Sequence, residues 1–418
     1  MGYLSLIVIL FIYYFIVLFY NRNENTKLII SLIVYYIFYD YLFLNIEQTI
    51  GASVTTILKL FYEFIIILIY IKSTNGLKTN KYDTKFKLVL MCVCCGCIIS
   101  VFSVFSFSNL LKGFRLYFEP WIASYILYKS KRFKNVNMHT ISIALCVIVS
   151  ILICFSVYQM ETVSRLNQLW FFSKFSKINS NLYNSSFLYF RENQVRAPSF
   201  FDGPIAASLF YSYAACLFLT CIKCKMKNKI IFFVFMLVSL YGVYLSRTRI
   251  GFSVFFLFLI YISITKKSVL LQLLIPACAV FITFYSLIAG YYNEPSAYGR
   301  LIQYGNFFAD FRMQGLGIAD SDALVKYDSF FISFFLSIGF CTILFYTFIA
   351  FYLKKSSVFF KKKYNQNNVL IYYNYGITVV SVYIIAFQFY AGYAPYKFYA
   401  LIFMMAYYDL NTKLNEGK

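Results

Sequence analysis

Long apolar runs alternate with short polar breaks along the whole chain. Most runs are about 20 residues long, the length at which an α-helix crosses the apolar core of a bilayer. The pattern therefore predicts an all-α polytopic membrane protein with about 11–13 transmembrane helices, built as a single integral membrane domain over residues 1–418. The predicted spans are 2–20, 27–45, 52–71, 86–107, 110–128, 138–158, 201–222, 229–246, 250–265, 268–290, 329–353, 369–390 and 394–409.

Composition agrees with this class, since 61% of the residues are hydrophobic and only 13% are charged. The net charge of +22 would indicate nucleic-acid binding in a soluble protein. In a membrane protein the same excess follows from the preference of lysine and arginine for cytoplasmic loops, so we expect no nucleic-acid partner.

Lysine marks one set of alternating breaks. Most of the Lys and Arg residues lie in short breaks between spans and in the C-terminal tail. The positive-inside rule assigns these breaks to the cytoplasm, so we expect a cytoplasmic C-terminus. The two longest loops, 159–200 and 291–328, then face outward.

The long outward loops differ from the lysine-rich breaks because they carry arginines, carboxylates, glycine and proline. Lysine serves as a topogenic anchor, whereas the arginine fork suits a carboxylate or a phosphate. Outward arginines oppose the positive-inside bias. They either snorkel towards lipid headgroups or form an anion site at the outer membrane face. The candidate arginines are Arg115, Arg191, Arg196, Arg247, Arg249, Arg300 and Arg312.

Three outward stretches hold most of these arginines. In "RENQVRAPSFFDGPIAAS" (191–208), Pro204 is expected at the first position of a helix with Asp202 as its N-cap, and a helix N-terminus beside Arg196 is a ready anion site. In "SRTRIG" (246–251), two arginines lie in the break between two spans. In 298–339, apolar side chains at helical spacing predict a short amphipathic helix, which "GLG" ends.

The polar loop after that helix contains candidate catalytic chemistry. Asp328, beside Tyr327, is our candidate for a general base acting on a hydroxyl. Asp310, Asp320 and Asp322 lie nearby, and with Asp328 they offer oxygen ligands for a divalent cation, but their spacing matches no EF-hand.

Two other features are interpreted as structural. The "CVCCGC" stretch at 92–97 has no histidine or carboxylate near it and is typical of helix packing rather than of a metal site. His139, the single histidine, lies at the cytoplasmic start of a span. We expect no metal and no cofactor.

The order of these motifs resembles that of the O-antigen polymerase and ligase superfamily of bacterial inner membranes. The similar stretches are "KGFRLYFEPWIASYIL" (112–127), "VRAPSFFDGPIAAS", "SRTRIGF" and "GRLIQYGNFF…GLGIADS…YDSFFISFFLSIG", spread over roughly 112–345. The ligase branch carries an arginine in the first long loop, an arginine in a "GR" motif and a His–Asn pair at the end of the second loop. Arg196 and Arg300 match the two arginines, but Tyr327 and Asp328 stand in place of the pair, so the resemblance favours a polymerase.

The resemblance implies a metal-independent glycosyltransferase of the inner membrane, acting at the periplasmic face. Its donor and acceptor would be oligosaccharides linked to undecaprenyl diphosphate, with membrane lipids and a chain-length regulator protein as further partners. Arginines would stabilise the diphosphate, whose charge grows as the glycosidic bond breaks. Arg300 and Asp328 would then be catalytic, while the other arginines and Tyr327 would bind substrate. A lipid-linked oligosaccharide flippase and an O-antigen ligase are the alternatives.

Overall fold

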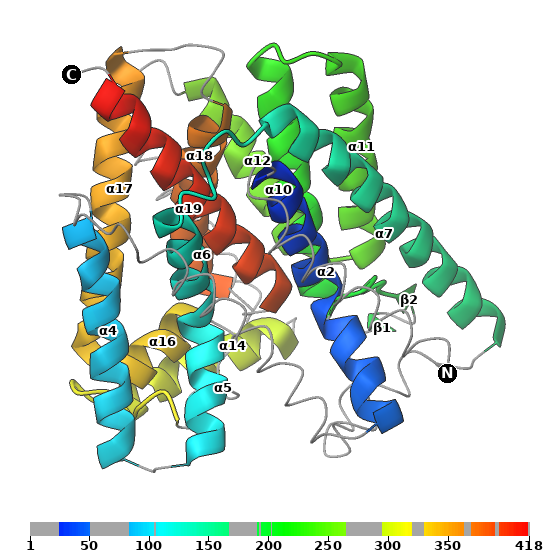
Figure 1. The fold of residues 1–418 in the computed structure, drawn as a ribbon. Helices are drawn as coiled ribbons and strands as arrows, with labels where there is room; N and C mark the ends of the chain where they lie inside the picture. The colour runs from blue at the N-terminus through cyan, green and yellow to red at the C-terminus, as the bar shows by residue number, and fades with distance from the viewer. Residues whose placement is uncertain are drawn as a thin grey trace.

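The computed structural model describes residues 25–50, 83–103, 106–166, 190–191, 194–201, 203–264, 295–319, 330–362, 369–388 and 393–416. These residues form a bundle of helices with a two-residue antiparallel ladder beside it (Figure 1). The elements are α2 (Asn25–Ile50), α4 (Asp83–Phe102), α5 (Phe107–Tyr117), α6 (Glu119–Lys129), α7 (Met138–Leu166), β1 (Phe190–Arg191), β2 (Gln194–Val195), α10 (Pro204–Lys223), α11 (Lys229–Ser246), α12 (Arg249–Ile264), α14 (Pro295–Asp310), α16 (Phe330–Ile338), a short 3₁₀ turn η1 (Gly339–Cys341), α17 (Thr342–Lys362), α18 (Val369–Gln388) and α19 (Tyr393–Glu416).

The predicted class is confirmed, because five apolar helical segments within the described residues are long enough to cross a membrane. α11 shows the expected lipid-facing surface, with Ile230, Phe233, Leu237 and Tyr244 all exposed. The predicted spans 2–20, 52–71 and 268–290 lie outside the described residues.

α10 forms the centre of the bundle. Of the residues in its apolar stretch, 83% are buried. The helix contacts α7, α11, α12, α18 and α19. Small side chains permit this close approach, since Ser212 Oγ donates to the carbonyl of Gly251 at 2.8 Å. A Cβ at Gly251 would collide with Ser208 and Ser212, so this contact fixes the α11–α12 hairpin against α10.

The polar ends of the helices fall into two groups at opposite ends of the bundle (Figure 1). The lysine-bearing C-terminal ends of α10, α17 and α19 lie at the upper end in that view. The β1–β2 ladder, α14 and α16 lie at the lower end. Within the described residues, these lysine-bearing helix ends therefore lie apart from the segments of the predicted outward loops. Which end faces outward stays a prediction.

The predicted span 110–128 is wrong as a single helix, because the chain breaks at Phe118 into α5 and α6. Phe118 has φ −120° and ψ −34°, and Pro120 follows within the first turn of α6. Proline has no N–H to donate to the carbonyl four residues earlier, so the helix cannot continue through it. The break leaves Glu119 buried at the start of α6.

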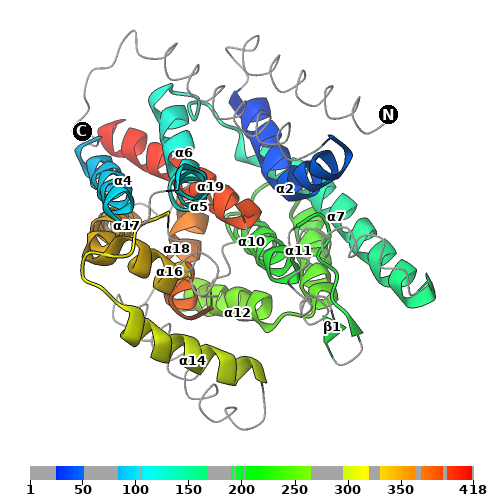
Figure 2. The ribbon, with the colours of Figure 1, turned by 90° about the horizontal axis from the view of Figure 1, so that it is seen from below.

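The predicted span 329–353 is also interrupted. α16 ends at Ile338, Gly339 turns the chain with φ +63°, and α17 begins at Thr342. A left-handed residue cannot continue an α-helix, and glycine adopts it without the steric cost of a Cβ. α16 consequently lies across the lower end of the bundle, whereas α17 runs along it (Figures 1 and 2).

Two smaller predictions about helix ends need correction. α7 extends to Leu166, so the first outward loop begins later than residue 159. Pro204 is the first residue of α10 as predicted, but the N-cap is Gly203 rather than Asp202, which lies outside the described residues. The amphipathic helix predicted to start at Arg300 is present as α14, which begins earlier, at Pro295. Gly315 and Gly317, both with positive φ, follow its end.

Candidate functional site at the arginine-bearing end

The segment before α10 is tied to α7 and α11. Ser199 donates its backbone N–H to Gln159 Oε1 at 2.9 Å and accepts from Gln159 Nε2 at 3.0 Å. The backbone N–H of Ala197 donates to the carbonyl of Leu245, at the end of α11, over 3.1 Å. Ser199 is fully buried, and its backbone is in the left-handed region with φ +54°. These bonds hold residues 196–199 in one place, because each satisfies a buried polar group.

This segment brings Arg196 to the turn between α11 and α12. Arg196 Nε lies 3.5 Å from the carbonyl oxygen of Ser246, the last residue of α11. Arg247 follows in the left-handed conformation, with φ +50°, and donates its N–H to the carbonyl of Tyr244. Arg196 therefore lies against the backbone of the turn that carries Arg247.

The Arg247 side chain is half-buried, and its Nε has no hydrogen-bond acceptor among the described residues. A buried N–H without an acceptor costs about 1–3 kcal/mol, and more when the group is charged. Such a donor is suited to an anionic ligand, which would supply the acceptor.

Arg249 differs from Arg247 although it is two residues away. It is the first residue of α12 and is exposed. The sequence favoured Arg247 for contact with an anion and Arg249 for snorkelling, and the difference in burial runs in the same direction. Their functional roles stay predictions.

A second pair of predicted arginines lies on two contacting segments. Arg115 is half-buried in the last turn of α5, and Arg312 is exposed just after α14. The segments meet where Gly113 packs on Ile318, since a Cβ at Gly113 would lie 2.8 Å from the carbonyl carbon of Ile318.

Hydrogen bonds to the end of α16 fix the chain after Arg312. Leu316 and Gly317 donate their backbone N–H groups to the carbonyls of Leu336 and Ser337, both over 2.8 Å. Ala319 donates to Ser100 Oγ of α4 at 3.2 Å. We call residues 312–319 the glycine segment; it lies between α4, α5 and α16.

The remaining predicted site residues have no described side chain. Arg191 pairs with Gln194 in the β1–β2 ladder, and Arg300 lies in α14, but only their backbones are described. Tyr327 and Asp328 lie outside the described residues, as do Asp320 and Asp322. The general base therefore stays a prediction.

Sequence reasoning missed an ion pair buried inside the bundle. Lys397 Nζ of α19 lies 3.5 Å from Glu119 Oε1, and their side chains are only 1% and 8% exposed. The same ammonium lies 4.0 Å from the ring centroid of Tyr39 of α2. Charged residues within apolar segments are rare and functional more often than not, a signal that could have singled out each residue but not their pairing.

The cysteine stretch 92–97 lies in α4. Cys92 is buried, and its thiol donates to the carbonyl of Cys341 at 3.4 Å. Across the part of the chain that the structure describes, no three His, Cys, Asp or Glu side chains gather as a metal site would require.

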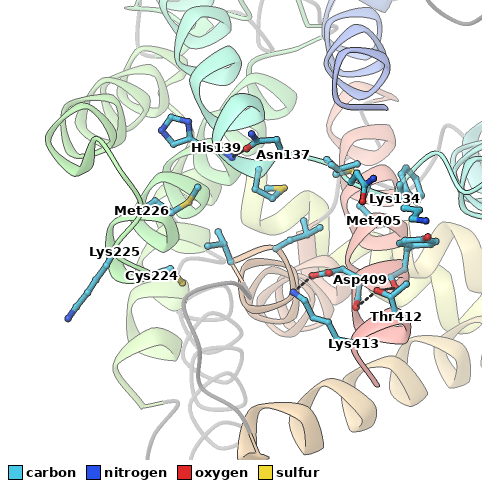
Figure 3. Close-up of a pocket in the computed structure, with 17 residues that line it drawn as sticks. Lys134, Asn137, His139, Cys224, Lys225, Met226, Met405, Asp409, Thr412 and Lys413 are labelled. Carbon is cyan, nitrogen blue, oxygen red and sulfur yellow. Dashed lines mark hydrogen bonds and ion pairs between the residues drawn. The ribbon is translucent and has the colours of Figure 1, made fainter. Parts of the chain in front are cut away.

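A cavity of about 710 Å³ opens at the opposite, lysine-rich end of the bundle (Figure 3). Its walls come from the α6–α7 and α10–α11 connections, the start of α18 and the last turns of α19. Lys413 is paired with Asp409 at 2.7 Å, and Lys225 points away from the cavity (Figure 3). None of the predicted site residues lines it.

No protein-family model matches the chain, and no curated protein or solved structure matches it either.

Proposed function

We propose that the protein is a glycosyltransferase that polymerises oligosaccharide repeat units carried on undecaprenyl diphosphate, as an O-antigen polymerase does. The site would face the periplasm and the lysine-rich end the cytoplasm, since the positive-inside rule favours that orientation. One observation carries the proposal: Arg196 contacts the α11–α12 turn that carries Arg247, whose buried Nε has no acceptor in the part of the chain that the structure describes.

The chemistry requires stabilisation of a leaving group more than it requires acid catalysis. A sugar hydroxyl of the acceptor attacks the anomeric carbon of the donor, and a new C–O bond forms. The bond from that carbon to the diphosphate oxygen breaks, and undecaprenyl diphosphate leaves with the electron pair. Fixed arginines stabilise this charge more strongly in the transition state than in the bound donor, which is what accelerates a reaction.

The hydroxyl proton must pass to a base during the attack. Asp328 is the candidate, with Tyr327 beside it, and Arg300 is assigned to the diphosphate with Arg196 and Arg247. Arg115, Arg191, Arg249 and Arg312 complete the proposed substrate-binding set. No step of this scheme requires a metal ion.

A flippase for the same lipid-linked oligosaccharide is the second candidate, because it would also need cations for a diphosphate. It would place them in a central cavity along several spans. The observation against it is that Arg196 and Arg247 lie at one end of the bundle, beside the turn that ends α11.

Deletion of the gene in its source strain tests the proposal. Loss of a polymerase leaves lipopolysaccharide capped with a single repeat unit, whereas loss of a flippase or a ligase leaves no capped lipopolysaccharide. An unchanged ladder of long chains on a gel would refute the polymerase function. Complementation with Arg196→Ala or Arg300→Ala should restore the membrane protein but not the ladder.

A further inference from the structure

The first turn of α19 forms hydrogen bonds to both sides of the break between α5 and α6. Because the helix is interrupted, the carbonyl of Tyr117 accepts a hydrogen bond from Tyr396 Oη at 3.0 Å. The same hydroxyl accepts from Trp121 Nε1 at 2.6 Å. Tyr396 therefore satisfies one polar group on each side of the break.

The next residue of α19 adds charge to this contact. Lys397 pairs with Glu119, the first residue of α6, where the positive end of the helix dipole also favours a carboxylate. Tyr36 and Tyr39 of α2 place their rings 5.7 and 4.0 Å from the ammonium, so α2 encloses the pair from another side. α19 contacts both α2 and α6, and the three lie together in the view from below (Figure 2).

Burying two charges is expensive, and apolar residues of similar volume often give a protein of equal or greater stability. A buried ion pair is therefore weak evidence for stability. A role in holding a defined arrangement explains it better here, because three separate segments converge on it.

The break is connected onward to the arginine-bearing end. Tyr117 Oη lies 2.5 Å from Ser333 Oγ and 3.3 Å from Ser337 Oγ, both on α16. The carbonyl of Ser337 in turn accepts the N–H of Gly317 in the glycine segment. One continuous set of contacts thus runs from Lys397 to the segment that begins at Arg312, and Arg115 lies four residues before Glu119, on the other side of the break.

We propose that Lys397 and Glu119 are positioning residues for the transferase site, an inference that rests on the proposed function. The pair fixes the direction of α5 relative to α6, and through α16 it fixes the glycine segment. Arg115 and Arg312 are thereby held where both can contribute to substrate binding.

The test compares a double variant, Lys397→Met with Glu119→Met, with the full-length wild-type protein in proteoliposomes. The matched control is Lys413→Met with Asp409→Met, which removes an ion pair at the far end of α19. Two readouts are used: hydrogen exchange of the backbone, and kcat and KM for chain extension with a lipid-linked repeat unit.

We expect the first double variant to accumulate normally and to keep wild-type exchange in α10 and α11. Exchange should rise at least tenfold in the glycine segment and in α16, and kcat should fall at least tenfold with KM changed less than threefold. Lys397→Arg, which keeps the charge, should retain at least a third of the wild-type kcat. The control variant should behave as wild type.

Unchanged exchange in the glycine segment, or unchanged kcat in the folded double variant, would overturn the inference. Failure of the double variant to accumulate would also overturn it, because the pair would then be needed for folding rather than for positioning. If the wild-type protein extends no chains, the proposed function fails, and that result is distinct because the exchange measurement requires no substrate.

Discussion

Gly113 offers a sharp test of how the glycine segment is held. A methyl group at this position of α5 would lie 2.8 Å from the carbonyl carbon of Ile318 and closer still to its oxygen, whereas ordinary contacts begin near 3.4 Å. The Ile318 backbone would have to move by more than half an ångström. It is restrained on both sides, by the bonds from Gly317 to Ser337 and from Ala319 to Ser100.

The expected cost of Gly113→Ala follows from these contacts. Overpacking costs about 1–3 kcal/mol, and loss of one or both restraining bonds adds about 1 kcal/mol each. Replacing a helical glycine by alanine returns about 1 kcal/mol of intrinsic helix stability. The free energy of unfolding should therefore fall by about 1–4 kcal/mol.

Gly305→Ala is the matched control, because Gly305 also lies within a helix, α14, and a Cβ there meets nothing within 4 Å. It should gain about 0.5–1 kcal/mol. Melting temperatures of the purified proteins in one detergent, followed by size-exclusion chromatography after heating, compare the two directly. If Gly113→Ala were as stable as Gly305→Ala, the close packing of α5 on the glycine segment would be wrong.

Three further predictions concern single side chains. Arg247→Ala should lower the rate of chain extension about 10–150-fold, the equivalent of a lost charge-assisted hydrogen bond. Arg249→Ala should lower that rate by a smaller factor, because Arg249 is exposed, and equal effects in a vesicle assay would contradict the distinction between the two arginines. Tyr396→Phe should remove the acceptor of the Trp121 indole N–H and a donor to the Tyr117 carbonyl, lowering the free energy of unfolding by about 1–3 kcal/mol for each group, and a wild-type melting temperature would contradict this. Burial raises the pKa of Cys224 to about 11, against a smaller opposing effect of the adjacent lysine. A variant whose only cysteine is Cys224 should react with a maleimide about tenfold faster for each pH unit from 8 to 10, because only the thiolate reacts, whereas a rate that levels off near pH 9 would contradict the shift.

The sequence predicted the features that depend on local pattern. Apolar runs of membrane length place α7, α10, α11 and α12 within a few residues of their observed bounds, apart from the longer C-terminal end of α7. Side chains at helical spacing after Arg300 predicted α14. The break at Phe118 was missed because hydropathy averages over a whole span, although Pro120 carried the local signal.

Contacts between distant segments could not be predicted in the same way. The sequence identified Arg196 and Arg247 separately, but it could not show that a bond from Ala197 to Leu245 brings them to one turn. The ion pair of Lys397 with Glu119 depends on the mutual arrangement of α2, α6 and α19, and no pattern within any one helix encodes it. Nor could spacing alone reveal that Gly113 packs on Ile318.

The ion pair has a consequence for the order in which the protein is made. Glu119 enters the membrane early in synthesis, and Lys397 emerges only with α19. At usual elongation rates the carboxylate waits on the order of tens of seconds for its partner. During that interval the dipole of α6 compensates part of this charge, and α19 completes the pair, so α19 acts as the closing element of assembly. Chains that stop before α19 should be recognised as unfinished and degraded by membrane proteases.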